Sequence, residues 1–338
     1  MDISREHAKD RKQADMLGPY LLPALVVAIA IIFILSRFGP SAVSVRLSVF
    51  TTIFLGIFIE ASPFLVAGSI LSGLLEVYVG TEMISRFVPR NKILAALTGS
   101  LLGIIFPVCE CGVVPVTRRL YRKGIPPAVG ISFFLAAPVV NPIVLLGTYS
   151  AFGWGPILYG RLLISIGIAF VIGLTFTQAQ PDDILLPHVI DGHGEHHHPV
   201  EGFFPKLFTA LSVGGDDFLD MIRYLIIGSM LAAAMQTFVP QSSLLAIGGG
   251  PILSIIVLMV LAFVLSICST VDAFIALSFT SSFTTGSILA FLTFGPMVDI
   301  KSTLLFLSVF KRPTVIKMIG MATVLSFTVA LIFNLVGG

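Results

Sequence analysis

Long apolar stretches separated by short polar junctions make up most of the sequence. The segments 18–36, 48–78 and 156–177 each contain an apolar run of the length that a membrane span requires, about 20 residues for a bilayer core about 30 Å thick. Strands of a β-barrel would be shorter and would alternate apolar with polar positions. The pattern therefore predicts an all-α polytopic membrane protein.

Two further apolar segments contain residues that interrupt a helix. In 93–117 the motif Pro-Val-Cys-Glu-Cys-Gly lies between two apolar runs, and basic clusters stand on both sides of the segment. Both clusters favour the cytoplasm, so we expect a re-entrant hairpin rather than a crossing. In 125–152, Pro138 and Pro142 remove backbone donors and predict one broken span.

The second half of the chain repeats the first with a period of about 158 residues, a signature of internal duplication. The matching pairs are Glu60 with Asp220, Cys111 with Cys268, Pro138 with Pro296, and Asn141 with Asp299. Basic residues border the hairpin of the first half, whereas the corresponding positions 237–243 and 279–285 carry none. We therefore expect two inverted-topology repeats whose re-entrant or broken helices meet at the membrane midplane.

This organisation predicts four parts: a cytoplasmic tail with the first transmembrane helix (1–47), the first transmembrane repeat (48–177), a His-rich polar linker (178–203) and the second repeat (204–338). The linker is rich in histidine, glycine and acidic residues, a composition typical of disordered chain. Its histidines are His188, His193, His196, His197 and His198. No metal is assigned to them.

Composition supports a membrane protein and excludes other classes. Hydrophobic residues make up 56% of the 338 residues and charged residues 11%, which is too little polar surface for a water-soluble protein. The net charge of +2 arises from bases at the junctions, which argues against nucleic-acid binding. Three cysteines in apolar surroundings predict no structural disulfide. Without a close cleavage site, the first span is expected to be retained in a bacterial inner membrane.

The densest group of reactive side chains is Cys109-Glu110-Cys111, at the expected hairpin turn. Thiolates bind soft partners such as trivalent arsenic, copper(I) or zinc. Buried cysteines can also pack as small apolar groups, but proline, glycine and glutamate at the same place are poor choices for packing alone. Together with Pro138 and Asn141 at the neighbouring break, these residues are candidates for substrate binding, and no cofactor is expected.

The second half adds further candidates at equivalent positions. For substrate binding they are Cys268, Ser269, Thr270, Asp272 and Asp299. A charged aspartate at the centre of a span costs about 2.5–3.5 kcal/mol on translocon scales, so acids within spans are candidates for function. We expect Glu60, Asp220 and Asp272 to couple protons. An interfacial or protonated acid is the alternative, above all for Asp220, which lies near Arg223.

Residues 106–149 read FPVCECGVVPVTRRLYRKGIPPAVGISFFLAAPVVNPIVLLGTY. They resemble the signature region of the YraQ-type predicted permeases, a family that includes the ArsP-like organoarsenical exporters, and the resemblance extends over most of 48–336. It implies a membrane permease. For some members it implies efflux of trivalent methylated or aromatic arsenicals, for which cysteine thiolates are suitable ligands.

The leading hypothesis is a secondary transporter, an exporter of a small soft or thiol-reactive solute, and not an enzyme. One alternative is a membrane thiol-disulfide or electron-transfer protein that uses Cys109 and Cys111, although Cys-x-Cys lacks the usual two-residue spacer. Another is a noncatalytic membrane subunit of a larger permease complex. The expected partners are a small-molecule or ion substrate and the lipid bilayer, with a homodimer or a partner subunit left open.

Overall fold

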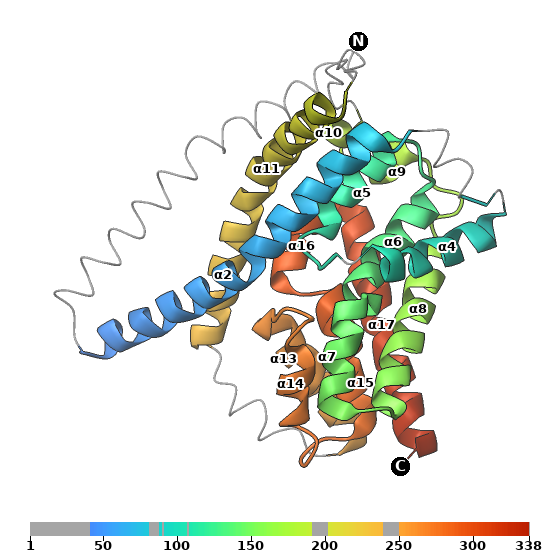
Figure 1. Cartoon of the computed structure of the whole chain (residues 1–338). Coiled ribbons are helices and arrows are strands. Elements are labelled where there is room, and N and C mark those ends of the chain that lie inside the picture. The colour runs from blue at the N-terminus through green and yellow to red at the C-terminus, as the bar shows by residue number, and fades with distance from the viewer. Residues whose placement is uncertain are drawn as a thin grey trace, which may run out of the picture. The chain divides into compact units, whose positions relative to one another are not determined.

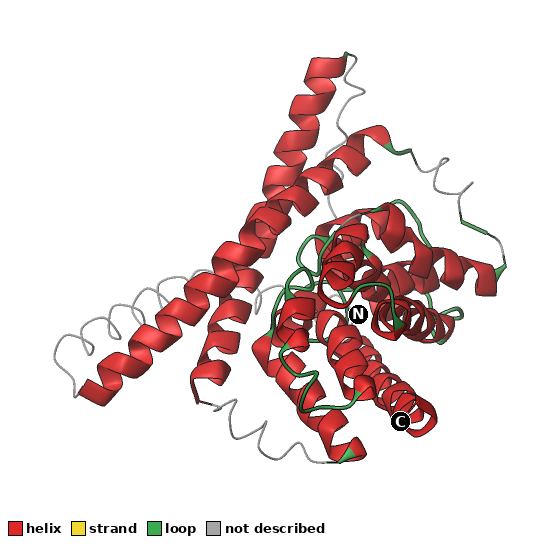
Figure 2. Ribbon diagram, turned by 60° about the horizontal axis from the view of Figure 1, so that its bottom comes forward, coloured by secondary structure: helices red, strands yellow, loops and turns green. Residues whose placement is uncertain are grey.

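The described part of the protein is built from helices. The computed structural model describes residues 41–80, 88–89, 91–106, 108–190, 202–238 and 250–337. Within these ranges the structure is helical, with one isolated bridge between Leu185 and Phe310 (Figure 1, Figure 2). Six helical segments are long and apolar enough to span a membrane, and two of them, Pro127–Phe152 and Thr285–Leu307, are interrupted pairs of shorter helices. The predicted all-α polytopic fold is confirmed.

Contacts separate residues 1–53 from a second unit, Phe54–Gly338. Of the first unit the structure describes only 41–53, the beginning of helix α2 (Ser41–Tyr78). Residues 1–40, which contain the predicted tail and first span, lie outside the described residues. The candidate site belongs entirely to the second unit.

The same order of elements occurs twice in the chain. A long helix is followed by two short helices joined by a turn, then by a helix pair interrupted at one polar residue, then by a final apolar helix. In the first half these are α2, α4 (Lys92–Ile105), α5 (Val113–Arg122), α6 (Pro127–Val140), α7 (Pro142–Phe152) and α8 (Pro156–Leu174). In the second half they are α11 (Phe203–Phe238), α13 (Pro251–Leu265), α14 (Asp272–Leu277), α15 (Thr285–Met297), α16 (Ile300–Leu307) and α17 (Arg312–Gly337). A chain built from two repeats is expected to show the same order of elements twice.

Both helix pairs are interrupted at a residue that caps the second helix. The Asn141 side chain accepts a hydrogen bond from the Ile143 N–H at 2.8 Å, at the start of α7. The Asp299 side chain accepts one from the Ser302 N–H at 2.5 Å, at the start of α16. Asparagine and aspartate are favoured caps because their side chains satisfy backbone donors that a helix start leaves free. The broken span predicted around Asn141 is confirmed.

The two interrupted pairs run in opposite directions through the second unit. Figure 1 draws α6 and α16 at mid-height and α7 and α15 below them. The chain therefore descends from α6 to α7 and ascends from α15 to α16. An inverted repeat would produce this arrangement, but the orientation of each half in a membrane stays a prediction.

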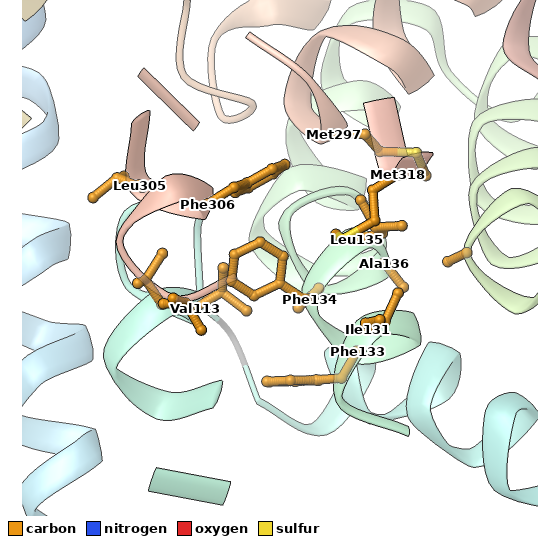
Figure 3. Packing of buried hydrophobic residues seen from close by; sticks show 14 of the residues in the cluster. Val113, Ile131, Phe133, Phe134, Leu135, Ala136, Met297, Leu305, Phe306 and Met318 are labelled. Carbon is orange, nitrogen blue, oxygen red and sulfur yellow. The ribbon is translucent and has the colours of Figure 1, made fainter. Parts of the chain in front are cut away.

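Two helices form the centre of the second unit. Every residue of α6 is buried, and so is every residue of α15 from Gly286 to Met297. The helices α4, α5 and α8 pack on α6, while α13 and α17 pack on α15. Figure 3 shows Phe134 of α6 beside Phe306 of α16, and their ring centroids lie 4.6 Å apart in an edge-to-face contact. The core thus joins the two halves.

The first part of the linker predicted to be disordered is folded. It forms the short helices α9 (Pro181–Ile184) and α10 (Pro187–Ile190). Between them, the Leu186 N–H donates to the Val309 carbonyl at 3.0 Å. The disorder prediction is wrong here because this segment contains apolar residues that become buried, namely Ile184, Leu185 and Val189. The histidine-rich part, 191–201, lies outside the described residues.

Membrane orientation can be tested with one new cysteine in each half. Asp183 in the linker and Ser282 after α14 are both exposed, whereas the three native cysteines are buried. Because basic residues favour the cytoplasm, Asp183→Cys should react with an impermeant maleimide only from the cytoplasmic face, and Ser282→Cys only from the outer face. Labelling of both positions from the same face would exclude inversion.

Candidate functional site

Two turns, one in each half, carry the three cysteines. The turn 106–112 joins α4 to α5 and contains Cys109 and Cys111, and the turn 266–271 joins α13 to α14 and contains Cys268. All three cysteines are free and buried, with 4%, 2% and 4% of their surface exposed. Turns that are distant in sequence lie close in space, because Ser266 of the second turn is hydrogen-bonded to Ile300 and the next residue, Lys301, lies 3.6 Å from Glu110 of the first turn.

Each turn is also linked to the helix break of its own half. The Asn141 side-chain amide donates to the Val108 carbonyl at 3.5 Å, and Val108 directly precedes Cys109. In the second half, the Ser266 hydroxyl accepts the Ile300 N–H at 3.1 Å. The turns and the breaks therefore form one continuous buried region.

A buried lysine faces two carboxylates in this region. The Lys301 Nζ atom lies 3.6 Å from a Glu110 carboxylate oxygen and 3.8 Å from an Asp299 carboxylate oxygen. All three residues are at most 2% exposed. Lys301 also interacts electrostatically with Cys111 and Cys268. One ammonium group is thus shared between two acids and the thiol-bearing turns.

The two carboxylates of this cluster are incompletely satisfied. Asp299 uses one oxygen to cap α16, while its other oxygen and both oxygens of Glu110 have no hydrogen-bond partner among the described residues. Their distances to Lys301 exceed the usual range of N–H···O hydrogen bonds, about 2.7–3.2 Å. Buried acceptors without donors are unfavourable, and in membrane proteins such groups mark pathways for substrates and ions. The cluster can therefore accept further donors.

A second buried pair holds Asp272, the first residue of α14. Arg161 of α8 donates to both carboxylate oxygens of Asp272, at 2.8 and 2.7 Å, and to the Thr148 hydroxyl of α7 at 2.8 Å. Arg161 is completely buried and Asp272 is 3% exposed. The charge of Asp272 is thus compensated by a bidentate partner, and the pair fastens α14 to α7 and α8.

Arg161→Lys should destabilise the protein by about 1.5–3 kcal/mol, because a lysine cannot reproduce the two parallel hydrogen bonds to Asp272. Equilibrium unfolding in detergent measures this loss. The exposed Arg312 provides a control, since Arg312→Lys should stay within about 0.5 kcal/mol of the wild type. If Arg161→Lys and Arg312→Lys are equally stable, the bidentate pairing of Arg161 with Asp272 does not contribute to the stability of the protein.

The remaining substrate-binding candidates lie in the same buried region. Pro138 is buried in α6, shortly before the Asn141 break. Ser269 is 1% exposed, and its hydroxyl has no partner in the described part of the chain. The Thr270 hydroxyl donates to the Cys268 sulfur at 3.4 Å. Within the described ranges, no group of three or more His, Cys, Asp or Glu side chains is arranged to hold a metal ion.

The other two candidates for proton coupling occupy different surroundings. Glu60 is half-buried on α2 and interacts electrostatically with Lys301, which connects it to the cluster. The Asp220 side chain is 52% exposed and lies 3.6 Å from Arg118 and 3.8 Å from Arg223. The structure therefore brings Glu60 into range of the buried site and places Asp220 in an exposed ion pair.

Two glycines let the long helices approach the site closely. A Cβ atom at Gly68 of α2 would lie 2.3 Å from the Gly112 backbone, next to the cysteine turn. A Cβ atom at Gly228 of α11 would lie 3.1 Å from the Lys301 Cα atom. Gly68 and Gly228 occupy equivalent positions in the two halves of the sequence. Larger residues would push the long helices away from the site.

Sequence reasoning missed three charged residues of this interior: Lys301, Arg161 and Asp217. Each is buried within an apolar helix. The signal that could have found them is the presence of an ionisable residue inside an apolar span, which is rare unless the residue has a partner or a function. Lys301 also follows Asp299 by only two positions.

A buried polar site at interrupted helices, within a multi-pass membrane fold, is typical of membrane permeases. Comparison with known proteins agrees with this class. Residues 46–335 match the family model ArsP_1, described as a predicted permease, and the chain belongs to this family. It is a multi-pass cell-membrane protein.

Relatives support the same assignment. The chain is 48% identical over 263 residues to the UPF0718 protein YcgR of Bacillus subtilis. The aligned region covers 77% of this chain and 88% of YcgR. It is 38% identical over 289 residues to a "putative two-component membrane permease complex subunit" of Streptococcus mutans, covering 83% and 93%. It is 24% identical over 107 residues to the UPF0718 protein YraQ of Escherichia coli, covering 32% and 30%. The predicted resemblance to YraQ-type permeases is confirmed, and no solved structure matches the chain.

Proposed function

We propose that this chain is a secondary transporter that exports a small soft or thiol-reactive solute, with trivalent organoarsenicals as the leading class. The observation that carries the proposal is that the two turns with the three free, buried thiols border one buried region. In it Lys301 contacts Glu110 of the first turn, and the preceding Ile300 is hydrogen-bonded to Ser266 of the second turn. Thiolates are suitable ligands for trivalent arsenic.

The interrupted helices supply the rest of the proposed solute site. In transporters built from repeats, solute sites form where discontinuous helices meet, and the helix ends contribute partial charges. Here α7 and α16 begin directly after their capping residues, Asn141 and Asp299, beside the cysteine turns. Lys301 is proposed to hold the two carboxylates of the site in place while the thiols bind solute.

A second candidate function is that of one subunit in a permease complex. It is favoured by the printed name of the Streptococcus mutans relative, which describes a subunit of a two-component complex. Purified chain in proteoliposomes distinguishes the two candidates. Solute uptake by this chain alone would exclude an obligatory partner, whereas uptake only in native membranes would require one.

A toxicity screen tests the proposed function. Cells with and without the protein are challenged with arsenicals, metals and sulfur compounds, including phenylarsine oxide as a trivalent aromatic arsenical. Deletion should increase sensitivity to thiol-reactive compounds, and the wild-type gene should restore resistance. If the gene restores resistance to none of them, the exporter proposal fails.

A further inference from the structure

Four basic residues lie in the second half of α5 and at the residue that follows it, and all four contact neighbouring helices. Arg118 pairs with Asp220 of α11, and Arg119 with Asp217 of α11. Lys123 lies 3.5 Å from the Glu76 carboxylate of α2. Arg122 donates to the Val189 carbonyl of α10 at 3.1 Å. We call Arg118, Arg119, Arg122 and Lys123 the basic end of α5. It fastens this short helix to three other helices.

Arg119 and Asp217 form the central pair of this network. Arg119 donates to both carboxylate oxygens of Asp217, at 3.1 and 3.2 Å, and lies 3.8 Å from the Glu76 carboxylate. The Ser72 hydroxyl of α2 donates to Asp217 at 2.7 Å. The side chains of Arg119 and Asp217 are only 12% and 6% exposed. This is a buried pair that links α2, α5 and α11.

The same short helix begins at the thiol-bearing turn. Cys111 is followed by Gly112, the residue that precedes the first turn of α5. The helix α5 has only ten residues, about 15 Å of helix. The network and the proposed solute site therefore lie at the two ends of one short helix.

The second half has no equivalent network. Its short helix α14 and the residues that follow, 278–284, contain no lysine or arginine. Within the described residues, a multiple ionic attachment at a hairpin helix is thus a feature of the first half. By the positive-inside rule, the basic end of α5 faces the cytoplasm.

We propose that the basic end of α5 is a cytoplasmic gate, in which the Arg119–Asp217 pair holds the thiol-bearing turn closed to the cytoplasm. Opening separates Arg119 from Asp217, swings α5 away from α2 and α11, and admits solute to Cys109 and Cys111. The role of the thiols rests on the proposed function, whereas the movement of α5 does not. Ion pairs that break and re-form between packed helices are a common basis of two-state transitions.

The test measures the reactivity of the native cysteines from each face of the membrane. Everted and right-side-out vesicles containing the full chain are treated with an impermeant maleimide, and labelling of Cys109 and Cys111 is quantified by mass spectrometry. Asp217→Asn should accelerate labelling at least about tenfold in everted vesicles only, the size of a typical coupling between states. Asp217→Glu, which keeps the charge, should label more slowly than Asp217→Asn. Asp216→Asn, at an exposed carboxylate on the same helix, should match the wild type.

Loss of fold is distinguished from gate opening by the face that reacts. Unfolding would expose the thiols from both faces, so equal acceleration in the two kinds of vesicle overturns the proposal, as does unchanged labelling. This labelling assay needs no solute. It therefore tests the gate even if the toxicity screen shows that the protein does not export the proposed solutes.

Discussion

Lys301→Met should destabilise the protein by about 3–5 kcal/mol, the usual effect of removing one partner from a buried ion pair. The substitution leaves Glu110 and Asp299 without a counter-charge in an interior where both are at most 2% exposed. Methionine has a similar length and fills the same space, so lost packing contributes little. Equilibrium unfolding in detergent measures the change.

If the lost stability comes from the uncompensated carboxylates, neutralising them should restore part of it. Adding Glu110→Gln and Asp299→Asn to Lys301→Met should recover part of the lost stability, because neutral amides need no counter-charge. Asparagine at position 299 can still cap α16, as Asn141 caps α7. Lys206→Met, at an exposed lysine, should change stability by no more than about 0.5 kcal/mol. If the triple variant is no more stable than Lys301→Met, the interaction among these three residues is not electrostatic.

Cys109→Ser and Cys111→Ser should each abolish resistance to phenylarsine oxide while the amount of folded protein in the membrane changes little. A hydroxyl has nearly the shape of a thiol but is a poor ligand for soft elements. The expected loss of stability is about 1 kcal/mol, typical of a single substitution. Growth inhibition by phenylarsine oxide and membrane abundance are measured together.

Alanine variants provide the matched control for this experiment. Cys109→Ala removes the thiol without introducing a polar group, so it should abolish resistance as completely as Cys109→Ser. If alanine were tolerated and serine were not, the defect would come from a buried hydroxyl and not from loss of a ligand. Such a result would favour packing as the role of these cysteines.

The positions of the turns and breaks could be predicted because local chemistry determines them. A capping residue marks where a helix can start, so Asn141 before Pro142, and Asp299, are informative in the sequence alone. Pro138 and Pro296 lie inside α6 and α15, three residues before each break, so the prolines indicated the region and the caps its position. The cysteine turns were recognisable for the same reason. Comparison of the two halves then related each local feature to its counterpart.

The charge partners could not be predicted because packing determines them. Lys301 meets Glu110 across 191 positions of sequence only when α16 lies beside the turn before α5. Arg161 meets Asp272 in a similar way, so an acid expected to couple protons is found in a bidentate pair. The folded start of the linker was also missed, since its overall polarity hid the apolar residues Ile184, Leu185 and Val189.

Uptake of arsenic by everted vesicles tests the central claim most directly. Vesicles from native membranes, with and without the protein, are supplied with phenylarsine oxide, and the arsenic retained inside is measured over time. The proposed function predicts accumulation that requires the wild-type chain and is lost in a variant that lacks Cys109, Cys111 and Cys268. Equal accumulation in vesicles that lack the chain would contradict transport of this class of solute, and full accumulation by the cysteine-free variant would contradict ligation by thiolates.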